Sequence, residues 1–290
     1  MRDFEFLKKL YAEPGRIVVT AHRGFSGKHP ENTLEAFAAA VKLGVDFVEF
    51  DVRCSKDGVP VIMHDSTVDR STDGHGDVGS LPLAALRELN ASCWEGPHDS
   101  GLRLAAPARP SAPVPTLEEA LAALAGKVFL NIQVYASRRA ELETVCAAYR
   151  RHKLQGRAFL MLDSFAVAET VKGIDPTVDI CVGEARGDLE RHHAFGSTFI
   201  QPWREHVTPG FFPTAARLGL CANMFYANTA ADCCELLSLG AKGIMSDRPD
   251  IVMEVGGRPS GGEPGIPLAL IQPGSAAQAF SRDVSKTAEK

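Results

Sequence analysis

Two histidines of this 290-residue chain follow short apolar runs, and each has a charged neighbour. His22 precedes Arg23, and His64 precedes Asp65. A histidine titrates at about pH 6.5, so at neutral pH it either accepts or donates a proton. By default a histidine at the end of a strand is a hydrogen-bonded structural residue. With suitable companions, however, the two predict the acid and the base of one reaction.

A pair of carboxylates has the spacing of one strand face. Glu49 and Asp51 alternate with Val48, Phe50 and Val52, and side chains two residues apart point the same way. Adjacent carboxylates repel, and their burial is costly unless a cation neutralises them. Oxygen ligands of this kind suit Mg²⁺ or Ca²⁺, so the pair predicts a divalent cation site. The alternative is a strand face in contact with solvent.

Asn32 and Glu35 stand three residues apart, where an apolar-periodic stretch begins. In that spacing an asparagine caps a helix and a glutamate reaches back to the cap. We therefore expect both residues to have a structural role at a helix N-terminus.

The elements that must position these side chains alternate along the chain. Short β-branched or aromatic runs are candidate strands, and the amphipathic stretches between them are candidate helices. Such alternation is typical of an α/β fold with a parallel sheet, and a (β/α)8 TIM barrel fits it best. In that fold the C-terminal strand ends form the active face. The candidate strands are 17–21, 47–52, 59–64, 128–134, 158–162, 178–182, 199–201, 220–225 and 243–246, and the helices are 34–43, 117–124, 138–151, 166–173, 229–239 and 249–255.

Nine candidate strands are one more than such a barrel needs, so we expect at least one to be wrong. The segment between the strands 47–52 and 59–64 is also too short for a crossover helix, since a parallel connection takes about a dozen residues. Either a loop replaces one helix there, or the two strands form a hairpin.

Two segments depart from the barrel pattern. Residues 90–113 contain several prolines and predict an inserted loop or helical excursion over one face of the barrel, a common feature of substrate lids. From residue 256 the chain is rich in glycine and proline and then polar. We expect a barrel domain over 1–255 and a poorly ordered tail over 256–290. The alternatives for the tail are packing by residues 266–271 or a partner contact.

Composition restricts the kinds of partner and the cellular compartment that we expect for this protein. The net charge is −5 without a run of basic residues, which argues against nucleic acid. Nothing approaches the roughly 18 apolar residues of a membrane span, and the N-terminus lacks a signal-peptide core. The seven cysteines are odd in number and scattered, as expected for buried or free thiols in a reducing compartment. We expect a cytoplasmic protein of unknown oligomeric state.

Six motifs in order resemble the glycerophosphodiester phosphodiesterase family, a type of phospholipase-C-like phosphodiesterase. The resemblance continues through 115–119 and 243–249 and covers the chain up to about Glu254. Each motif is weak by itself, but their order and spacing are specific. The six are His22-Arg23-Gly24, Pro30-Glu31-Asn32-Thr33, Glu49-Phe50-Asp51-Val52, Lys56-Asp57-Gly58, His64-Asp65 and Arg70-Ser71-Thr72.

The resemblance implies a hydrolase of lipid and glycerol metabolism. It would cleave glycerophosphodiesters, including substrates derived from lysophospholipids, to glycerol 3-phosphate and an alcohol, with one divalent cation: Mg²⁺, Ca²⁺ or Mn²⁺. The family pattern makes His22 and His64 the general acid and base. It makes Arg23 the phosphate contact, and Glu49 and Asp51 metal ligands.

Three positions depart from the family pattern. Where the family usually has a glutamate ligand and a lysine near the phosphate, this chain has Gln133 and Tyr135. Glutamine offers a cation one neutral oxygen, and tyrosine donates a hydrogen bond to phosphate without adding charge. The two changes cancel in net charge, which indicates a retuned site. Phe225 stands where many relatives have a tryptophan and is expected to form an apolar wall.

Three functions fit these residues. The first is a metal-dependent hydrolase, with water or the substrate's own 2-hydroxyl as nucleophile. The second is a phospholipase-D-like lyase that releases a cyclic phosphate. The third, suggested by Gln133 and Tyr135, is a non-catalytic phosphodiester-binding protein. A sugar-phosphate enzyme without a metal would leave Glu49 and Asp51 unexplained.

Overall fold

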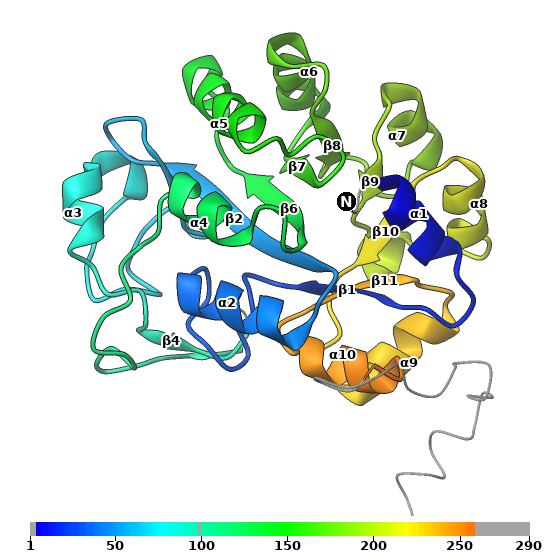
Figure 1. Cartoon of the computed structure of the whole chain (residues 1–290), viewed down its shortest axis with the longest axis horizontal. Helices are drawn as coiled ribbons and strands as arrows, with labels where there is room; N and C mark the ends of the chain where they lie inside the picture. Colours follow the sequence, from blue (N-terminus) through cyan, green and yellow to red (C-terminus); the bar gives the residue numbers. More distant parts are fainter. Residues whose placement is uncertain (1–3, 98–99, 259–290) are drawn as a thin grey trace, which may run out of the picture.

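The computed structural model of the chain describes residues 4–97 and 100–258, and in this part eight parallel strands close into a barrel. Each strand pairs in parallel with the next, and β11 pairs with β1 to close the ring (Figure 1). The TIM-barrel prediction is therefore confirmed. In order around the ring the strands are β1 (Val18–Ala21), β2 (Phe47–Cys54), β6 (Phe129–Val134), β7 (Ala158–Leu162), β8 (Asp179–Val182), β9 (Phe199–Ile200), β10 (Cys221–Met224) and β11 (Gly243–Ser246).

The ninth predicted strand is also a strand, so the expectation that one of the nine was wrong is itself wrong. β3 (Pro60–Ile62) pairs antiparallel with β2 and lies outside the closed ring. Only a short turn separates Cys54 from its partner Pro60. Such a turn is too short for a crossover, which leaves the hairpin as the arrangement available.

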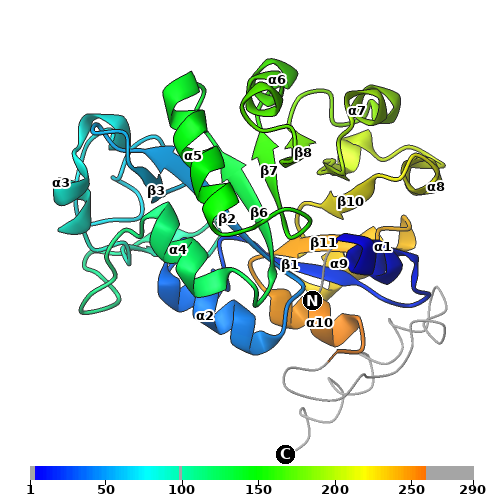
Figure 2. The same ribbon diagram turned by 45° about the horizontal axis from the view of Figure 1, so that its top comes forward.

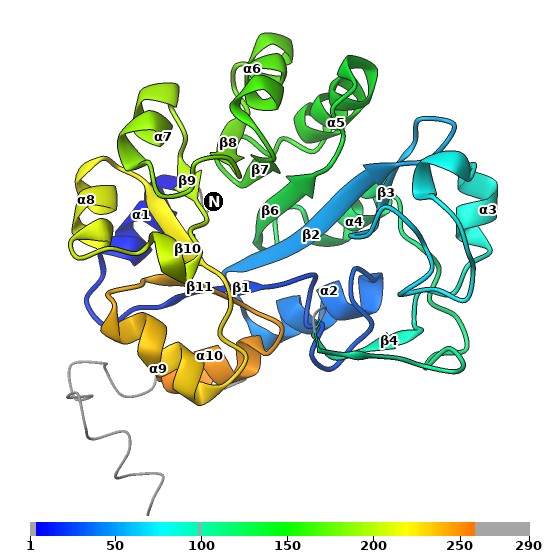
Figure 3. The same ribbon diagram turned by 180° about the vertical axis from the view of Figure 1, so that it is seen from behind.

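Helices surround the barrel, as Figures 1 and 3 show from opposite sides. The six predicted helices are present with bounds within one residue of the prediction. The prediction missed four helices, α1 (Phe4–Ala12), α3 (Leu83–Arg87), α7 (Leu189–Phe195) and α8 (Phe211–Arg217). The six predicted ones are α2 (Leu34–Leu43), α4 (Leu117–Leu124), α5 (Arg139–Arg151), α6 (Phe165–Ile174), α9 (Ala230–Ser238) and α10 (Pro249–Val255).

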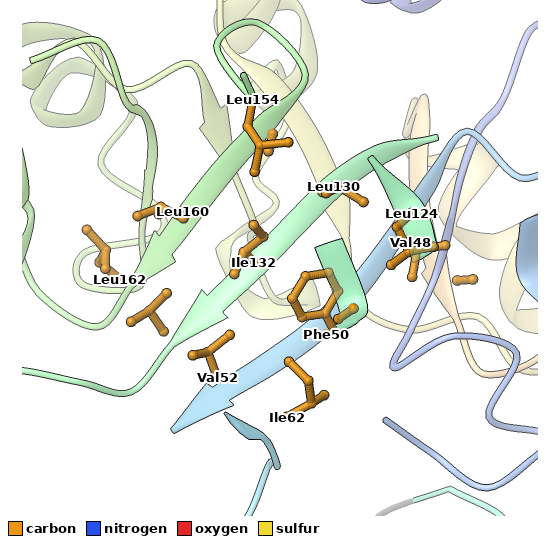
Figure 4. Packing of buried hydrophobic residues seen from close by; sticks show 14 of the residues in the cluster. Val48, Phe50, Val52, Ile62, Leu124, Leu130, Ile132, Leu154, Leu160 and Leu162 are labelled. Atoms are coloured by element: carbon orange, nitrogen blue, oxygen red, sulfur yellow. The ribbon is translucent and has the colours of Figure 1, made fainter. Parts of the chain in front are cut away.

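The outward faces of the strands pack against these helices. Figure 4 shows Val48, Phe50 and Val52 of β2 in one apolar cluster with Ile132 of β6 and Leu124 of α4. Because side chains alternate along a strand, the two acidic residues of β2 point to the barrel interior. The core thus fixes the direction of the predicted carboxylate pair.

The N-terminal end of the barrel is filled by apolar side chains and covered by α1. Leu7 of α1 is fully buried against a cluster that includes Val18, Phe47 and Phe159. The Phe159 ring also stacks on Phe199 with 4.1 Å between ring centroids. This end is closed by packing, which leaves the C-terminal end for chemistry.

The segment predicted to be an insertion lies beside the barrel on the side of α2 and α4 (Figure 2). Within residues 90–113, β4 (Trp94–Glu95) and β5 (Leu102–Arg103) form a small hairpin. Trp94 and Arg109 line a hollow together with residues 26–30, which follow β1. The insertion thus flanks the polar end of the barrel, and its action as a lid stays a prediction.

Several other expectations concern the chain as a whole. All seven cysteines are free, and six of them are buried, as expected. In the part of the chain that the structure describes, no helix has the length and apolar character needed to cross a bilayer. Most of the predicted tail, residues 259–290, lies outside the described residues.

Candidate active site

Contacts link the eight predicted site residues at the C-terminal end of the barrel. His22 Nε2 lies 3.9 Å from Glu49 Oε2, and the main chain and side chain of Arg23 reach both acidic residues of β2. Met63, just before His64, donates its N–H to the Asp51 carbonyl at 3.0 Å. Gln133 lies opposite Asp51 in the strand register and donates a hydrogen bond to Tyr135, whose ring contacts that of His64. The Phe225 ring contacts that of Tyr226, which in turn contacts the His22 ring.

His22 is buried at the end of β1 and is oriented by a carboxylate. Its Nδ1 lies 2.6 Å from Asp247 Oδ1, which also accepts a hydrogen bond from Ser26. Burial raises the pKa of Asp247, but His22, Ser26 and Asn228 outweigh it and hold that pKa well below the ordinary value. The ionised carboxylate keeps a proton on Nδ1, so Nε2, which faces Glu49, is the nitrogen free to exchange protons. Sequence reasoning included Asp247 in a motif without assigning it this position.

Arg23 adopts a left-handed backbone conformation with φ of 54°. Its N–H donates to Glu49 Oε2 at 2.8 Å, and its Nη1 donates to Glu31 Oε1 at 2.8 Å. Its Nε lies 3.3 Å from Asp51 Oδ2. The predicted phosphate contact is therefore a buried guanidinium held among three carboxylates.

The carboxylate pair of β2 has an unpartnered oxygen. Glu49 is buried, and its Oε1 has no hydrogen-bond partner among the described residues. Burial and the charge of Asp51 raise the pKa of Glu49 well above its ordinary value, although Arg23 offsets part of this. Within the described ranges no third His, Cys, Asp or Glu joins the pair in a metal-binding group. A cation fits this orphaned oxygen if its next ligand is of another type.

Gln133 supplies a ligand of that type from the neighbouring strand. It lies opposite Asp51 in the register of β2 and β6. Its Nε2 donates to Tyr135 Oη at 2.8 Å, which leaves the amide oxygen as its ligating group. Burial, reinforced by Asp51 and Glu49, raises the pKa of Tyr135 far above its ordinary value. Tyr135 is thus a neutral hydrogen-bonding group next to the candidate cation site.

His64 is oriented like His22 but is more open to solvent, with its side chain 25% exposed. Its Nδ1 lies 2.6 Å from Asp65 Oδ1, and Arg70 donates to the same carboxylate from Nε at 2.7 Å. Burial raises the pKa of Asp65, but His64 and Arg70 lower it well below its ordinary value. Arg70 is held in turn by Glu31 at 2.6 Å. Glu31 therefore connects the surroundings of Arg23 and His64.

The capping role expected for Asn32 and Glu35 is wrong. Thr33 caps α2 by accepting from the N–H of Ala36, and Glu35 pairs with His29 and Arg109 at the surface. Asn32 has a left-handed φ of 57° and donates from Nδ2 to Asp51 Oδ2 at 2.8 Å. The tight turn directs its side chain to the barrel interior, so Asn32 orients the carboxylate pair. Its place in the motif 30–33 was the clue in the sequence.

Aromatic rings line one side of the site. Phe225 is buried and stacks on Trp203, with 4.7 Å between centroids. Tyr226 packs against the His22 ring at 4.7 Å and against Trp203 at 6.2 Å. Sequence reasoning missed Trp203, because the residues after β9 carry no recognisable motif. The wall predicted from Phe225 alone is a cluster of three rings.

The chain is similar in sequence and in structure to known phosphodiesterases. The Glycerophosphoryl diester phosphodiesterase family model matches residues 22–251. A glycerophosphodiester phosphodiesterase of Bacillus subtilis (strain 168) is 28% identical over 260 residues, which cover 83% of this chain and 87% of that protein. The crystal structure of a glycerophosphodiester phosphodiesterase from Agrobacterium tumefaciens is 25% identical, with a TM-score of 0.70 and coverage of 82% of this chain and 100% of the other. An Oleispira antarctica phosphodiesterase in complex with the product sn-glycerol-3-phosphate shares the fold, with a TM-score of 0.66, 24% identity and coverage of 82% and 95%.

Proposed function

Because this chain belongs to the glycerophosphoryl diester phosphodiesterase family, we propose that it hydrolyses glycerophosphodiesters to glycerol 3-phosphate and an alcohol. One observation carries the proposal. Two histidines, each with a carboxylate 2.6 Å from Nδ1, share the barrel mouth with a buried carboxylate pair. The two histidines can supply the base and the acid of phosphodiester cleavage, and the carboxylate pair can supply a cation site beside them.

Glu49, Asp51 and Gln133 would hold one divalent cation. The orphaned oxygen of Glu49 supports this assignment, because a buried carboxylate without a partner is costly. When bound, the cation supplies Lewis-acid polarisation of a phosphoryl oxygen and neutralises developing charge. Oxygen ligands of these types suit Mg²⁺, Ca²⁺ or Mn²⁺.

The side chains of the protein would bind the phosphate and transfer the protons. Arg23 attracts and orients the phosphate by its charge, and Tyr135 does so as a neutral hydrogen-bond donor. Nε2 of one histidine takes the proton of the nucleophile, which is water or the substrate's own 2-hydroxyl. In the second case a cyclic phosphate forms first, and water must then open it to give glycerol 3-phosphate. The other histidine protonates the leaving alkoxide as its bond to phosphorus breaks. Asp247 and Asp65 hold the two rings in position throughout.

The test is release of glycerol 3-phosphate in a coupled assay, with EDTA and with each cation added back. We expect His22→Ala and His64→Ala each to lower kcat by about 10²- to 10⁴-fold. His75→Ala is the matched control, since that side chain is 79% exposed, and it should keep full activity.

Three outcomes would contradict parts of the proposal. Full activity in EDTA would show that the reaction needs no divalent cation. A cyclic phosphate as the final product in phosphorus NMR would show that the protein is a phospholipase-D-like lyase. Tight binding of phosphodiesters without turnover under any cation would show that it is a non-catalytic phosphodiester-binding protein.

A further inference from the structure

Arg186, in the loop after β8, folds back over the barrel mouth. Its Nη1 donates to the carbonyl of Gln201 at 2.6 Å, just beyond β9. Its Nη2 would be 3.2 Å from a Cβ atom added to Gly183, and Met161 Cε would be 3.0 Å from that same Cβ. Met161 pairs in register with Gln133, the candidate cation ligand. The absence of a side chain at Gly183 therefore gives the guanidinium its place.

Arg186 faces the histidine side of the site. In the closed ring β8 lies opposite β1, with three strands between them in either direction. Tyr226, Asp163 and Tyr135 are among the groups that interact electrostatically with Arg186. Two of these, Tyr226 and Tyr135, also contact His22 and His64. The guanidinium is thus the part of the mouth across from the proposed reacting groups.

The guanidinium of Arg186 is not ion-paired with a carboxylate among the described residues. Arg23 and Arg70 are bound by Glu31, Asp51 and Asp65. By contrast, the carbonyl of Gln201 is the one hydrogen-bond acceptor of Arg186 among the residues that the structure describes. An arginine has five N–H donors, so most of them remain available to a ligand.

The same guanidinium lies over the faces of two aromatic rings. Its Cζ lies 5.3 Å from the Trp203 ring centroid and 5.4 Å from that of Phe225. An ammonium-bearing ligand is usually held on such ring faces. Here a cation of the protein is already on them and repels a second one.

A hollow next to Arg186 offers room for an alcohol group. It has a volume of about 400 Å³, and polar side chains line it beside Trp203. Asp188 caps α7 by accepting from the N–H of Arg191, whereas Glu205 is exposed at the rim and can accept from hydroxyls. A guanidinium and a carboxylate beside an indole can together bind several hydroxyl groups.

We propose that Arg186 determines the alcohol specificity of this site, favouring glycerophosphodiesters whose alcohol is a neutral polyol and disfavouring those whose alcohol carries an ammonium group. The inference rests on the proposed phosphodiesterase function and adds the substrate class. A polyol can accept hydrogen bonds from the free N–H groups of Arg186. The ammonium group of choline or ethanolamine is instead repelled by the positive charge of Arg186, which lies over the rings that would otherwise bind it.

The test compares kcat/KM for glycerophosphoinositol and glycerophosphocholine. We expect the wild type to prefer the inositol diester, and Arg186→Gln to lower this preference about ten-fold or more because hydroxyl-binding donors and the like charge are lost together. Arg186→Lys, which keeps the charge but loses the planar fork, should have an intermediate preference. Arg191→Gln is the matched control, because Arg191 belongs to the same segment but pairs with Glu184 and stacks on Phe165.

A second variant separates position from charge. Gly183→Ala displaces the Arg186 Nη2 atom without removing the guanidinium and should lower the preference in the same direction. Thermal melting of each variant checks that it folds. An equal loss for both diesters, an unchanged ratio, or a wild-type preference for choline would overturn the inference.

Binding separates this inference from the proposed function. Dissociation constants for the two diesters, measured by calorimetry on the His22→Ala protein, should show the same preference and the same effect of Arg186→Gln. A wild type that hydrolyses neither diester but binds with this preference would defeat the proposed function alone. Hydrolysis of both diesters with no preference in rate or binding would defeat the inference alone.

Discussion

His22 and His64 are held in the same manner by different parts of the chain. His22 meets Asp247, which is 225 residues away, whereas His64 meets its neighbour Asp65. Burial raises the pKa of each carboxyl, but the partners of each lower it further and keep it ionised. An ionised carboxylate at Nδ1 fixes the tautomer and the ring orientation, as acid–base chemistry at Nε2 requires.

The neutral ligand at position 133 leads to a prediction about cation affinity. In Gln133→Glu a third carboxylate joins Glu49 and Asp51, so we expect about ten-fold tighter binding of Mg²⁺ or Ca²⁺ in calorimetry. Without cation the added repulsion should lower the melting temperature. Gln155→Glu, at an exposed loop position, is the control. Unchanged affinity would show that residue 133 does not ligate.

Glu31 leads to a prediction about pH. Burial raises its pKa, but Arg23 and Arg70 lower it from 4.5 to about 2. A lowered pKa adds stability that is present above the unfolded-state value and is lost as pH falls towards the folded-state value. Glu31→Gln should therefore destabilise by about 3 kcal/mol at pH 7, and by progressively less between about pH 4.5 and 2. Urea unfolding across that range measures the difference, and a constant difference would contradict the assignment.

At the scale of elements, the loop between β1 and α2 brings Arg23, Glu31 and Asn32 to the site. Arg23 and Asn32 are both left-handed, and the Asn32 N–H donates to the Arg23 carbonyl at 3.0 Å. Gly24, with φ of 80°, touches the first turn of α2, and a Cβ there would be 2.7 Å from the Ala36 carbonyl carbon. Strain of this kind is common where a loop must aim functional side chains.

We predict that Gly24→Ala moves this loop. The added Cβ meets backbone atoms that have no room to yield, so stability should fall by about 2 to 4 kcal/mol and kcat should fall with it. Gly58→Ala is a matched control, since Gly58 has a similar φ of 77° but nothing within 4 Å of an added Cβ. Urea unfolding and the coupled assay measure both effects. Equal effects of the two substitutions would show that the close approach to α2 is unimportant.

At the scale of the whole molecule, the two ends of the barrel have different tasks. The end under α1 is packed with apolar side chains, including the stacked rings of Phe159 and Phe199. The other end carries the buried charges and the two histidines. In this fold the first end maintains stability, and the second can change its chemistry through its loops.

Leu7→Ala tests this division. Leu7 is fully buried in the closed end, so its truncation should cost about 2 to 5 kcal/mol of unfolding free energy. The kcat of the folded protein should stay the same, because the site lies at the opposite end. Leu239→Ala, at a 44% exposed position, should change stability by less than about 1 kcal/mol. A loss of kcat in folded Leu7→Ala protein would show that the two ends are coupled.

The sequence by itself determined the features that depend on near neighbours. Apolar period and length located nine strands and six helices, and alternation along β2 directed Glu49 and Asp51 inward. These features need only backbone geometry and the burial of one face. The order of motifs, with its resemblance to a known family, then predicted that His22 and His64 are the acid and the base before their surroundings were known.

Tertiary structure decided the rest, because contacts between distant segments have no local signal. Asn32 fits a helix cap by spacing, yet it turns inward once β2 offers a carboxylate at 2.8 Å. The approach of Asp247 to His22 depends on closure of the ring by β11 and β1. The place of Arg186 over the mouth depends on space left at Gly183 and on the rings of Trp203 and Phe225. Such partners are set by packing in three dimensions, which spacing along the chain does not encode.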